Sequence, residues 1–152
     1  MKTIVALVDL SDLALGVLRQ AGQFASAFNA KLVILHVVPR QPAMLEVYPL
    51  APVGMRKPSQ EVLDSHHAKL QEMRDALVRE GVPSTIEQLV DLSSKEVLAE
   101  TKRLKADLIV LGSHPHSTFY HLVIGSMADD VLKNAPCPVV VVPEKVQAPA
   151  DT

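Results

Sequence analysis

Apolar runs alternate with amphipathic stretches along the chain. Residues 3–8 and 31–38 are nearly continuous runs of aliphatic, largely β-branched residues, which is typical of strands buried on both faces. Between these runs, apolar residues recur at helical spacing, with Ser11 or Asp12 available as the N-cap and Asn29 as the stop. This part of the sequence therefore predicts a strand–helix–strand unit.

A second helical pattern follows a proline-rich stretch. Residues 39–58 contain five prolines and one glycine, so they cannot hold regular structure for long, and we expect a long loop that acts as a lid or a contact surface. From Ser59 a helix is predicted, which ends at Gly81. Its apolar face is marked by Val62, His66, Leu70, Met73, Leu77 and Val78.

The remaining sequence predicts three more strands and two more helices. The strands are expected at residues 84–90, 106–112 and 138–143. Ser93 and Glu96 form a capping box that opens one helix, and the other starts near Ser126. Five strands alternating with four helices predict an α/β fold, a doubly wound, Rossmann-like parallel sheet with the strand order 3-2-1-4-5.

Length and charge narrow the classes of protein that fit. At 152 residues we expect one domain over residues 1–145 and a frayed tail over residues 146–152. A net charge of -2, with 21% charged residues, gives no basic patch for nucleic acid. The apolar run near the N-terminus is too short for a signal peptide or a membrane span, so we expect a cytoplasmic protein.

Ligands of such sheets bind beyond the carboxyl ends of the strands, where the strand order reverses. The first strand is followed by Asp9 without a glycine fingerprint for a dinucleotide, and the chain has no phosphate loop of the G-x4-GK[ST] type. The glycine-bearing segment after the fourth strand is the remaining candidate. There, the free amides of the helix that opens at Gly125 and Ser126 could hold a phosphate, or Ser126 could simply cap the helix. Gly112 could allow a close approach to a ligand, or could only form a turn.

The segments VDLSDLA, LHVV, ADLIVLGSH and IGSMADDVLKNAPCPVVVVP resemble, in order and over nearly the whole chain, the universal stress protein family. This resemblance implies an adenine nucleotide α-hydrolase-like fold, a homodimer, and membership of either an ATP-binding or a non-binding branch. The binding branch has glycine, two residues, glycine, nine residues, glycine and then serine or threonine. Gly112, Gly125 and Ser126 match this pattern, whereas Pro115 stands at the middle glycine.

The resemblance also implies roles for individual residues. Val8 and Val37 would line the adenine, while Ser113 and His114 would lie beside the phosphates of ATP, with or without Mg²⁺. Asp9 would accept from the ribose hydroxyls or order the site, although an acid just after a strand is also a routine N-cap. Asp91 stands where a glycine is frequent and would bring a carboxylate near the triphosphate.

Two functions remain open, and Pro115 separates them. Proline has no N–H to give to a phosphate and a fixed φ, so ATP binding should be weakened or lost. The chain is then either a nucleotide-binding stress or signalling module or a non-binding dimeric interaction protein of the same family. Neither is expected to be an enzyme beyond slow ATP hydrolysis, since residues 112–126 contain no lysine or arginine to stabilise a transferring phosphoryl group.

Three histidines lie near Pro115 and are candidates for metal ligands. His114, His116 and His121 lie within eight residues, but the extended backbone before Pro115 keeps the first two from converging, so we expect no metal site. Asp9 alone, without a second acid, makes a receiver-like phosphoacceptor a weak alternative.

Strand 138–143 is short, apolar and expected at a sheet edge, which predicts a homodimer through that edge.

Overall fold

Residues 1–42, 55–113 and 124–144 are described by the computed structural model, and within them five parallel strands form one sheet. Their order is β5-β2-β1-β6-β7, so the predicted order 3-2-1-4-5 is confirmed. The strands are β1 Thr3–Val8, β2 Lys31–Val38, β5 Ser84–Val90, β6 Leu108–Ser113 and β7 Val139–Pro143. Because the order reverses between β1 and β6, the switch point of the fold lies at their carboxyl ends.

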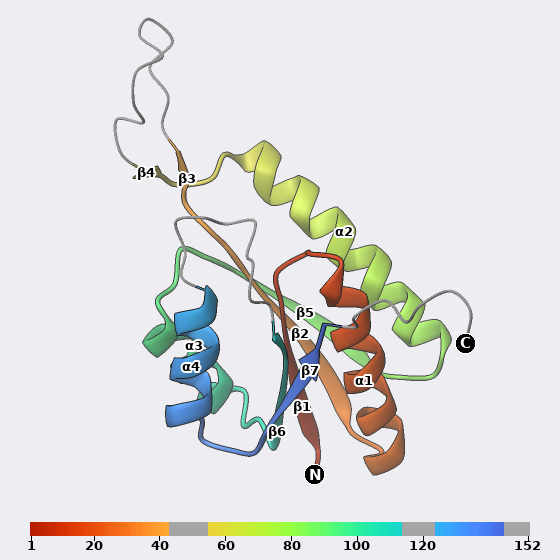
Figure 1. Cartoon of the computed structure of the whole chain (residues 1–152). Helices are drawn as coiled ribbons and strands as arrows, with labels where there is room; N and C mark the ends of the chain where they lie inside the picture. The colour runs from red at the N-terminus through yellow and green to blue at the C-terminus, as the bar shows by residue number, and fades with distance from the viewer. Residues whose placement is uncertain (43–54, 114–123, 145–152) are drawn as a thin grey trace, which may run out of the picture.

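Helices cover both faces of the sheet. They are α1 Leu13–Phe28, α2 Gln60–Arg79, α3 Ser94–Arg103 and α4 Ile124–Asn134. Figure 1 shows α1 and α2 on one face and α3 and α4 on the other. The doubly wound α/β fold predicted from the alternation of runs and amphipathic stretches is therefore confirmed.

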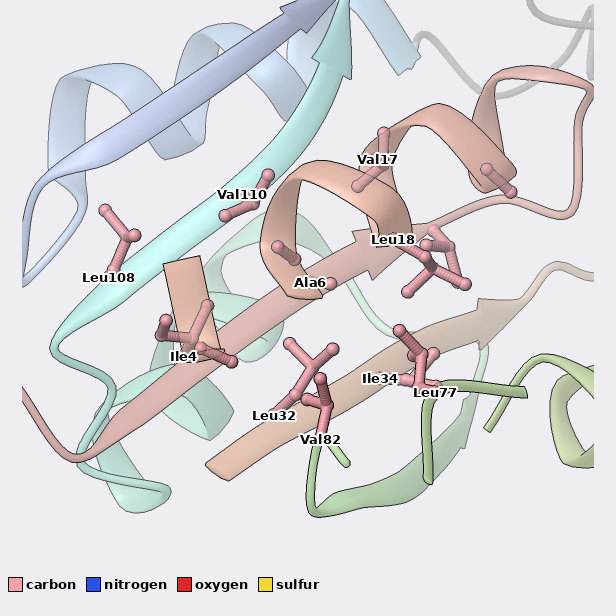
Figure 2. Close-up of a cluster of buried hydrophobic side chains, with 14 of the residues drawn as sticks. Ile4, Ala6, Val17, Leu18, Leu32, Ile34, Leu77, Val82, Leu108 and Val110 are labelled. Carbon is pink, nitrogen blue, oxygen red and sulfur yellow. The ribbon is translucent and has the colours of Figure 1, made fainter. Parts of the chain in front are cut away.

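The core lies in two layers on either side of the sheet. Figure 2 shows the layer beneath α1, where Ile4 and Ala6 of β1 meet Val17 and Leu18 of the helix. On the opposite face, Val5, Val33 and Leu35 pack against Val97 of α3. The central strands contribute to both layers, which is why their sequences are apolar at almost every position.

One expected member of the α2 apolar face does not belong to it. Leu70 and Leu77 are buried as expected, but Val78 is 50% exposed. Successive helical residues are about 100° apart around the axis, so a residue next to the buried Leu77 turns toward solvent.

The predicted helix ends are partly confirmed. Asn29 ends α1 in the left-handed conformation, and the capping box of Ser93 and Glu96 opens α3. Asp12 takes the N-cap position of α1, but its side chain makes no capping hydrogen bond, so the expected capping role is wrong. The turn is instead held by the Asp9 carboxylate, which accepts from the Ser11 amide at 3.0 Å.

The proline-rich stretch contains more structure than predicted. Two short strands, β3 Gln41–Pro42 and β4 Met55–Arg56, pair antiparallel and close the base of the loop. Residues 43–54 and the tail predicted to fray at 146–152 lie outside the described residues. No helix in the described parts of the chain is long and apolar enough to cross a membrane.

Candidate functional site

The carboxyl edge of the sheet brings several predicted site residues to one end of the molecule. Asp9 follows β1, while Val37 and Ser113 lie at or near the carboxyl ends of β2 and β6. Met127, in the first turns of α4, packs against the same buried cluster as Val37. The start of α4 therefore lies on the same face of the sheet as Val37, near the switch point.

The first turn of α4 begins earlier than predicted. The helix starts at Ile124, so Gly125 and Ser126 are its second and third residues and Ser126 is not the N-cap. Their position inside the turn keeps both residues among the first four amides, which have no partner within the helix. Two backbone donors and the positive end of the helix dipole are thus retained at the predicted position.

Val8 and Val37 do not form one apolar wall. Val8 is 7% exposed and packs in the cluster beneath α1, whereas the half-buried Val37 packs on the cluster beneath α3. The register explains this, because Val8 is paired with His36, and neighbouring residues of a strand point to opposite faces. Of the two valines, only Val37 has its side chain on the face where α4 begins.

Asp9 orders the turn between β1 and α1. One carboxylate oxygen accepts from the Ser11 amide, and Leu10 between them takes a left-handed φ of 62°. The other carboxylate oxygen has no hydrogen bond among the described residues. Asp9 is not the N-cap of α1, because that position is taken by Asp12.

Gly112 is required by packing, which sequence reasoning did not anticipate. It lies inside β6, and its φ is not in the left-handed region, so it does not form the expected turn. A Cβ at this position would lie 2.4 Å from Cδ2 and 2.9 Å from Cγ of Leu13, and 3.2 Å from Cγ2 of Val17. The close approach at Gly112 is therefore made by α1.

Replacing Gly112 with alanine is expected to lower the free energy of unfolding by about 1–3 kcal/mol, because the new methyl group overpacks the contact with Leu13. Gly16→Ala is the matched control, since its Cβ would meet only Leu13 Cδ1 at 3.9 Å. The control should stabilise the helix by about 0.5–1 kcal/mol. Chemical denaturation measures both, and equal stabilities of Gly112→Ala and the unchanged protein would contradict this role.

An ion pair at the carboxyl edge was also not predicted from the sequence. Arg40 Nε donates to Asp91 Oδ2 at 2.5 Å, with the two side chains 52% and 31% exposed. Asp91 has a left-handed φ of 53°, and its amide donates to Val38 O. Glycine adopts a left-handed φ more readily than other residues, so this conformation agrees with the glycine that is frequent here in the family. Because Arg40 neutralises the Asp91 carboxylate, this acid opposes a bound anion less than the sequence suggested.

Two histidines connect β2 with α2 beneath this edge. His36 is a buried, hydrogen-bonded residue of β2, with Nδ1 2.7 Å from Val8 O. Its Nε2 lies 3.0 Å from Nδ1 of His66, which is partly buried. The pKa of His36 is lowered from 6.5 to about 4, chiefly by burial and also by the charge of His66, although the Val8 hydrogen bond and Asp9 oppose the shift.

Part of the predicted site lies outside the described residues. This holds for His114, predicted beside the phosphates, and for Pro115 at the middle position of the pattern. It also holds for His116 and His121, the other members of the group weighed as metal ligands. Among the residues that are described, no three histidine, cysteine, aspartate or glutamate side chains gather as metal ligands would.

Comparison with known proteins places the chain in a family. The model of the universal stress protein family matches residues 1–143. A universal stress protein of Methanocaldococcus jannaschii is 30% identical over 142 residues, which cover 93% of this chain and 81% of that protein.

Solved structures agree with this assignment. The universal stress protein UspA from Lactobacillus plantarum superposes with a TM-score of 0.68 at 26% identity, covering 93% of this chain and 97% of that one. A universal stress protein in complex with cAMP gives a TM-score of 0.67 at 25% identity, covering 93% and 95% of the two chains. The chain belongs to the universal stress protein family.

Proposed function

We propose that this protein binds an adenine nucleotide, ATP with or without Mg²⁺, at the carboxyl edge of the sheet, and serves a stress-response or signalling role in the cytoplasm. The observation that carries the proposal is the position of the first turn of α4, whose free amides lie on the same face as Val37 near the switch point. The solved relative in complex with cAMP supports the class of ligand.

Different residues would contact the adenine, the ribose and the phosphates of the nucleotide. Val37 would contact the adenine, the free oxygen of Asp9 would accept from a ribose hydroxyl, and Ser113 with the amides of Gly125 and Ser126 would hold the phosphates. His114 would lie beside them. Val8 and Gly112 lie behind this site and make no side-chain contact with the ligand. The side chain of Val8 packs in the core, and Leu13 occupies the space where a Cβ of residue 112 would lie.

The proposed role is binding without rapid chemistry. Arg40 is a cation at the carboxyl edge, but its Nε already donates to the Asp91 carboxylate. Phosphoryl transfer needs positive groups placed on the transferring phosphate, so slow hydrolysis is the most that we expect.

Calorimetric titration of ATP and Mg²⁺ into the purified protein tests this function. Heat that saturates, together with a rise in melting temperature, is expected, whereas inorganic triphosphate should bind more weakly because it lacks the adenosine contacts at Val37 and Asp9. Absence of both signals at millimolar ATP would favour the alternative, a non-binding dimeric interaction protein. The covering of Gly112 by Leu13 and the proline at position 115 are the observations that favour it.

A homodimer through the β7 edge is the second part of the proposal. β7 pairs only with β6 among the described residues, and its Val141 side chain is 37% exposed. A short apolar edge strand with an exposed valine can pair with a second copy across a twofold axis.

Sedimentation should therefore show a dimer at micromolar concentration. Val141→Lys is expected to shift the dimer to a 16.5 kDa monomer, because two copies would bring their ammonium groups together at the axis. Val78→Lys, at a valine on α2 that is 50% exposed, is the control and should leave the dimer intact. A monomeric unchanged protein would contradict the proposed interface.

A further inference from the structure

His36 and His66 form a continuous hydrogen-bonded path from α2 to the end of β1, which we call the histidine relay. His36 is 1% exposed, with Nδ1 2.7 Å from Val8 O and Nε2 3.0 Å from His66 Nδ1. The two rings lie 5.2 Å apart between centroids, tilted by 41°. Both distances are those of ordinary hydrogen bonds, so each bond must have one donor and one acceptor.

The position of every proton follows from the carbonyl at one end. Val8 O can only accept, so His36 Nδ1 carries a hydrogen. A neutral His36 then has Nε2 as an acceptor, and His66 Nδ1 must donate to it. Both imidazoles are therefore protonated on Nδ1, and Nε2 of His66 has no hydrogen-bond partner among the described residues.

We propose that the histidine relay is a positioning device for the nucleotide site, in which His66 orders His36 and His36 fixes the carbonyl of Val8 and hence the Asp9 turn. This role rests on the proposed function, because Asp9 is one of its ligand contacts. Val8 precedes Asp9 directly, and Asp9 holds the amide of Ser11. A change in the relay is thus transmitted through the backbone to the turn at the switch point.

The charged neighbours of the relay favour the neutral state of His36. Asp9, after β1, favours the charged form, while His66 from α2 disfavours it. The pKa of His66 is itself lowered, first by burial and then by the charge of Lys69, one turn further along α2. The strand partner of His36 on β5 is the neutral Gln88, which bonds to His67 on the outer surface. Burial of His36 outweighs the attraction of Asp9.

The relay tolerates one added proton and not two. A first proton on His66 Nε2 leaves both hydrogen bonds in place, because His66 Nδ1 still donates to His36. A second proton on His36 Nε2 would place two N–H groups against each other across 3.0 Å and break the bond. Positioning of the Asp9 turn should therefore persist near neutral pH and fail in acid.

Nitrogen-15 NMR of the full-length protein tests the proton positions directly. Both His36 and His66 are expected to carry hydrogen on Nδ1, and His66→Ala should shift the amide resonance of Ser11. The same variant should weaken ATP binding about threefold to tenfold, the effect of losing one hydrogen bond. His66→Asn should restore both signals, since its amide nitrogen can donate in place of Nδ1, and the neighbouring His67→Ala should change neither.

The outcomes separate the relay from the nucleotide proposal. A His36 protonated on Nε2, or a His66→Ala variant with unchanged Ser11 amide and unchanged ATP affinity, would overturn the relay even if ATP binds. If the unchanged protein binds no ATP, while the tautomers and the Ser11 response are as expected, the positioning of the Asp9 turn stands and the proposed function fails.

Discussion

Replacing Pro115 with glycine is expected to strengthen ATP binding about tenfold to hundredfold. Proline at this position has no N–H for a phosphate and a fixed φ, whereas glycine supplies a donor and adopts the conformations that a phosphate-binding loop requires. The variant would also complete the glycine pattern of the ATP-binding branch, which Gly112, Gly125 and Ser126 already match. Calorimetric titration of the two proteins under identical salt and Mg²⁺ measures the difference.

A second proline provides the control for this gain. Pro136→Gly changes an exposed proline between α4 and β7, away from the proposed phosphate contacts, and should leave ATP affinity unchanged. Both variants lose some stability, because glycine increases the conformational freedom of the unfolded chain, so melting is measured beside binding. If Pro115→Gly binds ATP no better than the unchanged protein, the missing N–H is not what limits affinity.

Acid is expected to destabilise the fold through His36. Its pKa is about 4 in the folded protein, against 6.5 for the ordinary side chain, so between these values the unfolded chain binds the proton and the folded chain does not. The stability contributed by the neutral, buried ring is complete above the upper value and is lost as the pH falls toward the lower one. The loss amounts to at most about 3 kcal/mol, from 1.36 kcal/mol per pKa unit.

The contribution of His36 to the pH dependence of stability is isolated with a variant whose side chain does not titrate. Chemical denaturation from about pH 7 to about pH 4 should show a steep loss of stability for the unchanged protein and a flatter one for His36→Gln. The variant is less stable at neutral pH, because the relay and the Val8 bond are altered, so the comparison rests on the slopes. Parallel slopes would show that the pKa of His36 is the same in the folded and the unfolded chain, which would contradict this prediction.

The arrangement of strands could be read from the sequence, but the direction of their side chains could not. β1 and β2 are apolar at nearly every position, so they predict strands buried on both faces. The same feature removes the alternation that would tell one face from the other. Hence Val8 and Val37 could both be expected at the adenine, although the register turns them to opposite sides.

Contacts between elements far apart in the chain could be predicted from the sequence only in part. Arg40 and Asp91 follow β2 and β5, which are neighbours in the predicted order, so their pairing could have been found from opposite charges after adjacent strands. The contact of Leu13 with Gly112 and that of His66 with His36 depend on how each helix lies on the sheet. Helical periodicity gives the buried face of a helix but not its position along the strands.

Binding of an adenine nucleotide at the carboxyl edge of the sheet, beside the first turn of α4, can be followed residue by residue. Titration of the nitrogen-15-labelled protein with ATP, followed by the shifts of its backbone amides, tests the ligand and its place together. We expect saturating shifts at Asp9, Val37, Ser113 and Ser126, with Lys31 and Asp107 at the opposite edge unchanged. No shifts at millimolar ATP, or shifts confined to the opposite edge, would contradict it.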